Sequence, residues 1–376
     1  MRSDLLTVRS RSRNSVDHIL IQIIMNVKLN KGSENSSKSP LSSPQLTPKP
    51  VSEDFILDHT LRPKTFQEYV GQDKIKENIR VIVGAAKKRN EPMEHVLLHG
   101  PSGLGKTTLA YLIAKELGAN IRVTSGTALE KAGDVGSILS SLSDGDVLFI
   151  DEVHRLNKII EEVIYPAMEN FKLDIVIGKG NSAKTLQIDL PRFTLIAATT
   201  KISLLSAPFR SRFGINFRLD FYKNTDIEKI ITRSAELLGV ELEKDAIKII
   251  ASSSRFTPRV ANRLLKRVRD YAQIKEIPII NVTLAKESLK MLEIDDKGLE
   301  DTDRKILLTI ADKFGGGPVG LKSIAAAISE EEATIEDVYE PYLMQIGLLA
   351  RTSKGRIITP FGYKHLGLAS PKTTLL

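Results

Sequence analysis

Residues 100–107 constrain the fold of this chain more than any other segment. They read Gly-Pro-Ser-Gly-Leu-Gly-Lys-Thr and follow a strand-like run, and residues 108–115 after them have the pattern of a helix. This is the pattern G-x-x-x-x-G-K-[ST], in which glycines let backbone N–H groups turn inward around phosphate oxygens. Lys106 adds a positive charge beside the β- and γ-phosphates. We therefore predict a nucleotide-binding loop here rather than a Gly-rich structural turn.

A second motif lies forty-five residues after Lys106. An apolar run, residues 147–150, precedes Asp151 and Glu152. Asp151 at the end of a strand can hold Mg²⁺ together with the hydroxyl of Thr107, and Glu152 is placed to polarise a water that attacks the γ-phosphate. Such a run is common at strand ends, but its distance from the nucleotide-binding loop makes it specific here. The two motifs predict an enzyme that hydrolyses ATP with Mg²⁺, using Asp151 and Glu152.

Three short apolar runs indicate the type of sheet. Residues 96–98, 147–150 and 194–198 are apolar, are followed by polar residues, and alternate with helical stretches. Such runs are typical of parallel strands buried on both faces, with active groups at the carboxyl ends of the strands. We therefore predict an α/β fold with a parallel sheet. Residues 223–293 then read as nearly all helix, and residues 299–367 as three helices and a hairpin.

Polar groups after the third run fit the same hydrolytic site. Thr200 ends that run, and its hydroxyl can reach the γ-phosphate or the attacking water. Arg210 and Arg212 follow within residues 207–214 and can be ordinary surface arginines. In P-loop ATPases, however, an arginine in this place often stabilises the transition state on a neighbour's ATP. Such a role for one of these two arginines implies an oligomer.

The basic charge of this chain lies at its two ends. The formal net charge is +8, but residues 1–50 hold eight basic and three acidic residues, and residues 341–376 hold five basic residues and no acidic one. The segment between them therefore carries a net charge of −2. A basic end favours a polyanion as partner, although a solvated tail is the plainer interpretation of the N-terminal end.

Residues 1–54 are expected to be a disordered extension outside the fold. Residues 31–52 are rich in Ser, Pro, Lys and Asn, so they cannot bury enough apolar surface to offset their conformational entropy. Residues 18–27 are apolar but too short to span a bilayer, and we interpret the first 24 residues as an upstream translation extension before Met25. The absence of Cys agrees with a cytoplasmic protein, and no segment predicts membrane attachment.

Several segments together resemble a known family. They are residues 100–107, 151–155, 195–200, 207–215, 257–272 and 347–359, with 61–72 and 340–356 as the more specific ones. This set resembles the RuvB family of bacterial Holliday-junction branch-migration helicases, within the AAA+ superfamily. The resemblance implies a homohexameric ring that moves duplex DNA in recombination and repair. It also implies a large AAA+ ATPase domain over 55–222, a small helical lid over 223–293 and a winged-helix DNA-binding domain over 294–376.

The resemblance also assigns roles to residues. Arg212 matches an arginine that acts on the neighbouring subunit, and Arg259 matches a second sensor that reaches the phosphates from the lid. Family members often have Asp where Asn170 stands, Ser102 replaces the usual Pro without expected harm, and Glu332 stands where some relatives have a DNA-contacting Arg. The positions matching nucleotide contacts are Leu61, Arg62, Gly103, Lys106, Thr107, Thr108, Glu169, Asn170, Phe171, Arg212, Tyr222 and Arg259.

Residues 173–190 read as two strands around a Gly-containing turn. Apolar residues alternate along both arms, which suits either a hairpin that packs on its own domain or an interaction patch. The resemblance favours the second interpretation, with docking on RuvA, the junction-binding partner. It also implies that RuvC joins the assembly to resolve the junction.

The C-terminal domain is expected to bind DNA without reading its sequence. Residues 334–345 form the expected recognition helix, which holds three acidic residues and no Lys or Arg. Such a helix is poorly suited to reading bases in a major groove. The cations lie on the following hairpin, at Arg351, Lys354 and Arg356, which match DNA contacts or stand beside them. We therefore predict contacts to phosphates rather than to bases.

Two other functions remain open at this point. The chain can be a clamp-loader-type AAA+ switch that places a ring on DNA, or a winged-helix regulator in which ATP sets the oligomeric state. Glu152 and the acidic recognition helix weigh against the regulator. The winged helix and the segment 340–356 weigh against the clamp loader.

Overall fold

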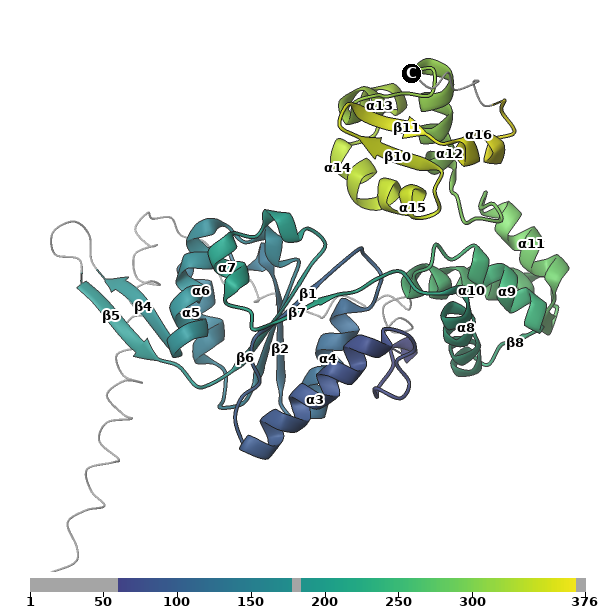
Figure 1. Ribbon diagram of the computed structural model, residues 1–376. Coiled ribbons are helices and arrows are strands. Elements are labelled where there is room, and N and C mark those ends of the chain that lie inside the picture. Colours follow the sequence, from purple (N-terminus) through teal and green to yellow (C-terminus); the bar gives the residue numbers. More distant parts are fainter. Residues whose placement is uncertain (1–59, 178–183, 370–376) are drawn as a thin grey trace, which may run out of the picture. The chain divides into compact units, whose positions relative to one another are not determined.

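The computed structural model describes residues 60–177 and 184–369 (Figure 1). The expected N-terminal extension lies outside these residues. Five strands form one parallel sheet in the order β2-β3-β6-β1-β7, which confirms the predicted α/β fold. The bounds of these strands are β1 Val96–His99, β2 Ile121–Ser125, β3 Val147–Asp151, β6 Thr194–Thr199 and β7 Ile215–Arg218.

The three predicted runs became the three central strands because their side chains are apolar on both faces. Successive residues of a strand point to opposite faces, so Leu98 and Phe149 pack on one side and Leu97 and Leu148 on the other. Helices cover both faces in Figure 1. The first face is covered by α3 Asp73–Arg89 and α4 Lys106–Leu117, and the second by α5 Ala132–Ser140, α6 Lys158–Asn170 and α7 Ala207–Ser211.

The predicted hairpin is present as β4 Lys172–Ile177 and β5 Lys184–Asp189. The two strands pair antiparallel, with Leu173 opposite Ile188. The turn of this hairpin, residues 178–183, lies outside the described residues. Leu173 is buried against α6 and its neighbours, whereas half of Leu186 is exposed. The base of the hairpin therefore packs on its own domain while the described part farther from the base carries an exposed apolar side chain.

Residues after the sheet form a helical unit. Its helices are α8 Asn224–Leu238, α9 Lys244–Ser252, α10 Pro258–Ile274 and α11 Val282–Met291. The structure adds a short parallel pair, β8 Glu241–Leu242 with β9 Ile279–Ile280, to the expected helices. Helix α10 begins at Pro258 because Thr257 caps it, accepting from the N–H of Val260. This cap sets the start of the helix that carries Arg259.

The last unit is a winged helix, as predicted. Residues 332–345 form one continuous helical stretch, through α14 Glu332–Thr334, a π-helical turn and α15 Glu340–Gln345. The hairpin is β10 Leu349–Thr352 with β11 Gly355–Ile358. The structure adds α16 Pro360–His365 to the expected elements, after α12 Asp301–Leu308 and α13 Leu321–Ile328. None of the described helices is long and apolar enough to span a membrane.

A buried ion pair joins the turn before α10 to the start of α12. Arg255 Nη2 lies 2.7 Å from Asp303 Oδ1, with 8% and 0% of the two side chains exposed, and the guanidinium also lies 4.7 Å from the centre of the Tyr342 ring. Removing one member leaves the other charge buried and unpaired. We expect Asp303→Ala to lower the free energy of unfolding by about 3–5 kcal/mol in urea denaturation.

The matched control for this prediction is on the same helix. Asp301 pairs with Lys305 at 2.6 Å, but both side chains are largely exposed. We expect Asp301→Ala to leave the urea transition nearly unchanged, because water replaces an exposed partner at little cost. An equal loss of unfolding free energy in Asp301→Ala and Asp303→Ala would contradict the large contribution assigned to the buried pair.

Candidate active site

The loop between β1 and α4 has the backbone that phosphate binding requires. Gly103 and Gly105 have φ values of 80° and 97°, in the left-handed region that residues with a Cβ rarely adopt. A Cβ on Gly103 would also come within 3.1 Å of the Cβ of Arg259. The loop ends where α4 begins, at Lys106, so unpaired N–H groups of the first helical turn face the pocket. This loop is therefore an anion site.

Lys106 supplies the cation of the site. Its Nζ donates to the carbonyl oxygens of Gly100 at 2.8 Å and Pro101 at 2.9 Å. Burial lowers the pKa of Lys106 to about 8, and the nearby carboxylates of Glu152 and Asp151 oppose this shift. The side chain thus stays mostly protonated at pH 7, and it lies ready to exchange its carbonyl partners for phosphate oxygens.

Thr107 and Asp151 meet at the end of β3. The Thr107 hydroxyl donates to Asp151 Oδ2 at 2.9 Å, and the other carboxylate oxygen accepts from the N–H of Glu152 at 2.9 Å. A hydroxyl oxygen and a carboxylate oxygen this close are hard donors of the kind that Mg²⁺ prefers. These two residues therefore fit a divalent metal held beside phosphates, as the sequence predicted for them.

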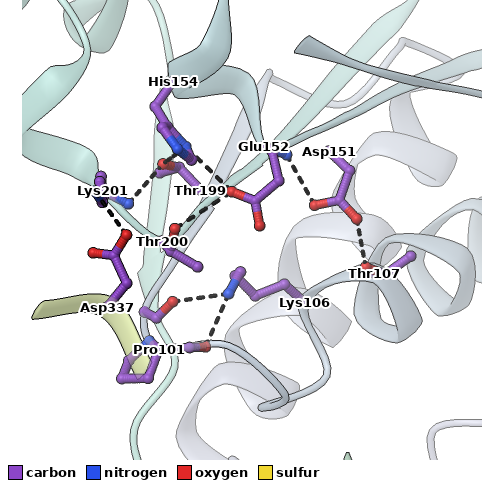
Figure 2. A network of polar contacts seen from close by, with 11 residues as sticks. Pro101, Lys106, Thr107, Asp151, Glu152, His154, Thr199, Thr200, Lys201 and Asp337 are labelled. Carbon is purple, nitrogen blue, oxygen red and sulfur yellow. Dashed lines mark hydrogen bonds and ion pairs between the residues drawn. The ribbon is translucent and has the colours of Figure 1, made fainter. Parts of the chain in front are cut away.

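Glu152 and Thr200 also come together, from the ends of two neighbouring strands. Thr200 Oγ1 lies 3.4 Å from Glu152 Oε2 (Figure 2). Glu152 lines the same pocket as Lys106, Thr107 and Asp151. A carboxylate in this position can polarise a water beside the terminal phosphate. The grouping arises because β3 and β6 are adjacent and parallel, so their carboxyl ends share one edge.

The helical unit closes the pocket from the other side. Arg259 Nη1 donates to Ser102 Oγ at 2.8 Å, and Tyr222, which precedes the helical unit, donates through Oη to the carbonyl oxygen of Leu104 at 3.1 Å. The replacement of Pro by Ser102 therefore supplies a hydrogen-bond partner that the sequence analysis did not expect. The predicted nucleotide contacts that line the pocket are Leu61, Arg62, Gly103, Lys106, Thr107, Thr108, Tyr222 and Arg259.

Several residues that line the pocket were not predicted from the sequence, and Arg233 is one of them. Arg233 on α8 donates to the carbonyl oxygen of Leu61 at 2.9 Å and pairs with Glu68 at 2.8 Å, which fixes the segment that enters the pocket. Nothing in the sequence distinguishes Arg233 from other arginines on amphipathic helices. Its role depends on which loop the helix meets in three dimensions.

Four of the predicted nucleotide contacts do not line this pocket, and neither does the predicted catalytic residue Thr200. Glu169, Asn170 and Phe171 end α6, and Arg212 follows α7. Arg212 Nε lies 3.1 Å from Glu169 Oε1, and the guanidinium lies 4.2 Å from the centre of the Tyr165 ring. The four residues belong to a different surface of the ATPase unit from the pocket that holds Lys106.

The three predicted DNA-binding cations have different surroundings. Arg351 and Lys354 are exposed on the hairpin, and Arg351 lies 3.4 Å from Glu336. Arg356 is instead buried, with two nitrogens 3.0 and 3.1 Å from the carboxylate of Glu340. The acidic residues of the preceding helix thus neutralise hairpin arginines. Burial and this pairing leave Arg356 less accessible to a phosphate than the exposed Arg351 and Lys354.

The fold and the site define a P-loop ATPase with a helical lid and a winged-helix domain. Models of RuvB domains match consecutive parts of the chain: the P-loop domain of the Holliday junction DNA helicase at 61–219, the AAA lid domain at 222–295 and the C-terminal winged helix domain at 296–367.

Solved structures agree with these matches. The RuvB Holliday junction branch migration motor of Thermotoga maritima is 50% identical, with 83% of this chain and 100% of that chain covered and a TM-score of 0.77. A mutant of the same protein matches with the same identity and TM-score, covering 83% of this chain and 99% of that one. The chain therefore belongs to the RuvB family.

Proposed function

We propose that this protein is an ATP-hydrolysing motor that drives branch migration of Holliday junctions in DNA recombination and repair. The observation that carries the proposal is the position of Glu152. It lies beside the Thr107–Asp151 pair and Lys106, in a chain that continues into a RuvB lid and a RuvB winged helix. The chain thus combines a carboxylate suited to hydrolysis with a winged-helix domain of a kind that binds DNA. This combination supports a protein that couples ATP hydrolysis to the movement of DNA.

Different pocket residues have different roles in ATP hydrolysis. Lys106 and the N–H groups at the start of α4 bind the phosphates, and Arg259 approaches from the lid. Thr107 and Asp151 would hold Mg²⁺, which neutralises phosphate charge when it is bound. Glu152 orients and polarises the attacking water, and Thr200 supports the carboxylate. These groups, which bind phosphates, a metal ion and an attacking water, suit ATP as the substrate.

The assembly that we propose is a homohexameric ring around duplex DNA. Its support is the position of Arg212, which does not line the pocket of its own chain and therefore suits a role at the site of a neighbouring subunit. The hairpin of β4 and β5 is the proposed docking site for RuvA, supported by the exposure of Leu186. RuvC is the proposed further partner at the junction.

A junction assay tests the motor directly. The full chain, RuvA and ATP are mixed with a synthetic four-way junction whose arms are homologous, and the separated duplex products are measured. We expect products with ATP and none with a non-hydrolysable analogue. A clamp-loader-type switch or a regulator would leave the junction intact even while hydrolysing ATP, and neither is favoured by the family matches.

The proposed DNA contacts predict a specific salt dependence. Each cation that neutralises one phosphate adds roughly 0.9 to the slope of log affinity against log salt concentration. Replacing exposed Arg351 and Lys354 together by Ala is therefore expected to flatten the slope by about two units per bound subunit, equally on two unrelated duplexes. Titrations at several salt concentrations measure both quantities.

Lys305→Ala is the control for this experiment. Lys305 belongs to the same domain but lies on α12, where it pairs with Asp301. We expect the slope of log affinity against log salt concentration for Lys305→Ala to match that of the unchanged protein. A loss of affinity on only one of the two duplexes would indicate base reading instead of phosphate contacts. Arg356→Ala then shows whether this buried arginine also reaches DNA, because the slope changes further only in that case.

A further inference from the structure

The side chain of His154 contacts Glu152, and the mechanism proposed above gives this contact no role. Its Nδ1 lies 3.2 Å from Glu152 Oε2 and 3.0 Å from Thr199 Oγ1 (Figure 2). Only 9% of the side chain is exposed. His154 therefore has little freedom to adopt another rotamer, and its contacts converge on the one carboxylate that polarises water.

The chemistry of these contacts assigns the proton of the ring. A carboxylate can only accept, so Nδ1 is attracted to Glu152 only when it carries hydrogen. Thr199 Oγ1 already accepts from the N–H of Lys201 at 2.9 Å and can accept a second hydrogen from the same Nδ1. The neutral Nδ1–H tautomer satisfies both neighbours. The imidazole thus presents the positive end of its N–H dipole to Glu152.

The backbone of Glu152 explains why the carboxylate needs support. Its φ and ψ are 48° and 47°, in the left-handed region that residues other than glycine seldom occupy. Such a conformation is strained and persists only where surrounding groups determine it. At the end of β3 this bend turns the side chain away from the strand. The contacts of Oε2 with His154 and Thr200 fix its direction.

The two carboxylate oxygens have different surroundings as a result. His154 and Thr200 both contact Oε2, whereas in the described part of the chain no hydrogen bond or ion pair involves Oε1. Figure 2 shows the second oxygen turned away from His154 and toward the side of Lys106. One oxygen is therefore anchored while the other faces the phosphate-binding side of the pocket.

We propose that His154 is a positioning residue for ATP hydrolysis, which holds Glu152 so that its unanchored oxygen faces the attacking water. Thr199 orients His154 in turn, and Thr200 contacts the same carboxylate oxygen from the next strand. The proposal rests on the proposed role of Glu152 as the group that polarises water. It adds two residues, His154 and Thr199, that do not touch the nucleotide and act only through Glu152.

Steady-state hydrolysis and nucleotide affinity of the full chain test the proposal. His154→Leu keeps a similar bulk but removes the N–H, and we expect kcat to fall by about 10²-fold because the carboxylate loses its orientation. The affinity for fluorescent ADP is expected to stay unchanged, since His154 does not contact the phosphates. His154→Asn places an amide N–H near the position of Nδ1 and is expected to restore kcat to within about threefold.

A second variant keeps the test decisive if His154→Leu does not fold. Thr199→Val preserves shape and removes only the hydroxyl that orients the imidazole. Its kcat is expected to fall roughly fivefold to tenfold, as for loss of one hydrogen bond, again without a change in ADP affinity. Full kcat in Thr199→Val together with a misfolded His154→Leu would overturn the proposal.

His95→Gln is the control for general destabilisation. His95 is also buried, but its ring accepts from the N–H of Leu195 and lies against the Met168 carbonyl, far from any role with Glu152. We expect a lower melting temperature with unchanged kcat per folded molecule. Wild-type kcat in His154→Leu, or no recovery in His154→Asn, overturns the positioning role. Normal turnover in Glu152→Gln would instead overturn the proposed role of Glu152 in hydrolysis, and an unchanged four-way junction in the junction assay would overturn the proposed function, so the failures are distinguishable.

Discussion

Glu152→Gln is expected to bind nucleotide normally and to lose at least about 10²-fold in turnover. The amide has the shape of the carboxylate, so the pocket and its contacts with Thr200 are kept, but an amide oxygen polarises water far less than a carboxylate. Lys106→Ala is expected to behave in the opposite way and to lose nucleotide binding, because the phosphates lose the buried cation beside them. Titration with fluorescent ADP and phosphate release at saturating ATP separate the two defects.

Glu162→Gln provides the control for this comparison. Glu162 is exposed on α6 of the same domain and carries the same side chain. It is expected to match the unchanged protein in both affinity and turnover. Normal phosphate release by Glu152→Gln would remove Glu152 from the hydrolytic step, and retained binding by Lys106→Ala would mean that the N–H groups of the loop hold the phosphates without the lysine.

Arg212→Ala is expected to bind ATP and to hydrolyse it more slowly by about 10³-fold, the scale found for an arginine supplied to a phosphoryl-transfer site. The structure supports a role between subunits because Arg212 lies beside Glu169 and over Tyr165, away from the pocket of its own chain. Nucleotide affinity is expected to change little, since the arginine stabilises charge that develops only in the transition state.

Mixing two inactive variants tests whether Arg212 acts across an interface. Glu152→Gln keeps an intact Arg212, and Arg212→Ala keeps an intact Glu152. A mixed oligomer can therefore form sites that pair one intact residue of each kind, and activity is expected to exceed the sum of the separate proteins. Arg210→Ala is the control, because Arg210 is exposed two residues earlier and is expected to have normal turnover. Mixtures that never exceed the sum would contradict the assignment in trans.

Much of the fold and the phosphate-binding part of the pocket were predictable from local patterns. The three central strands are recognisable because strands buried on both faces must be continuously apolar. The phosphate loop is recognisable because its glycines, Lys106 and Thr107 must stand at fixed spacing to surround phosphates. Asp151 and Thr200 follow from the rule that the carboxyl ends of parallel strands meet at one edge.

Other features depended on partners that are distant in the sequence. The spacing of Arg351 and Arg356 indicates two cations on one hairpin, but only the packing against Glu340 shows that Arg356 is buried. The resemblance likewise implies that Glu169 and Arg212 are nucleotide contacts, and the structure places them beside each other and outside the pocket lining.

The sequence by itself determined the order of the domains, the phosphate loop and the acidic pair that follows it, because each depends on residues close together in the chain. Only the tertiary structure decided that Thr199 contacts His154 and that Arg233 holds the segment at Leu61. A histidine or an arginine has the same local signal wherever it lies on a helix or turn. Its role is set by the charge and hydrogen-bonding groups that folding brings against it, and by the burial that strengthens those contacts.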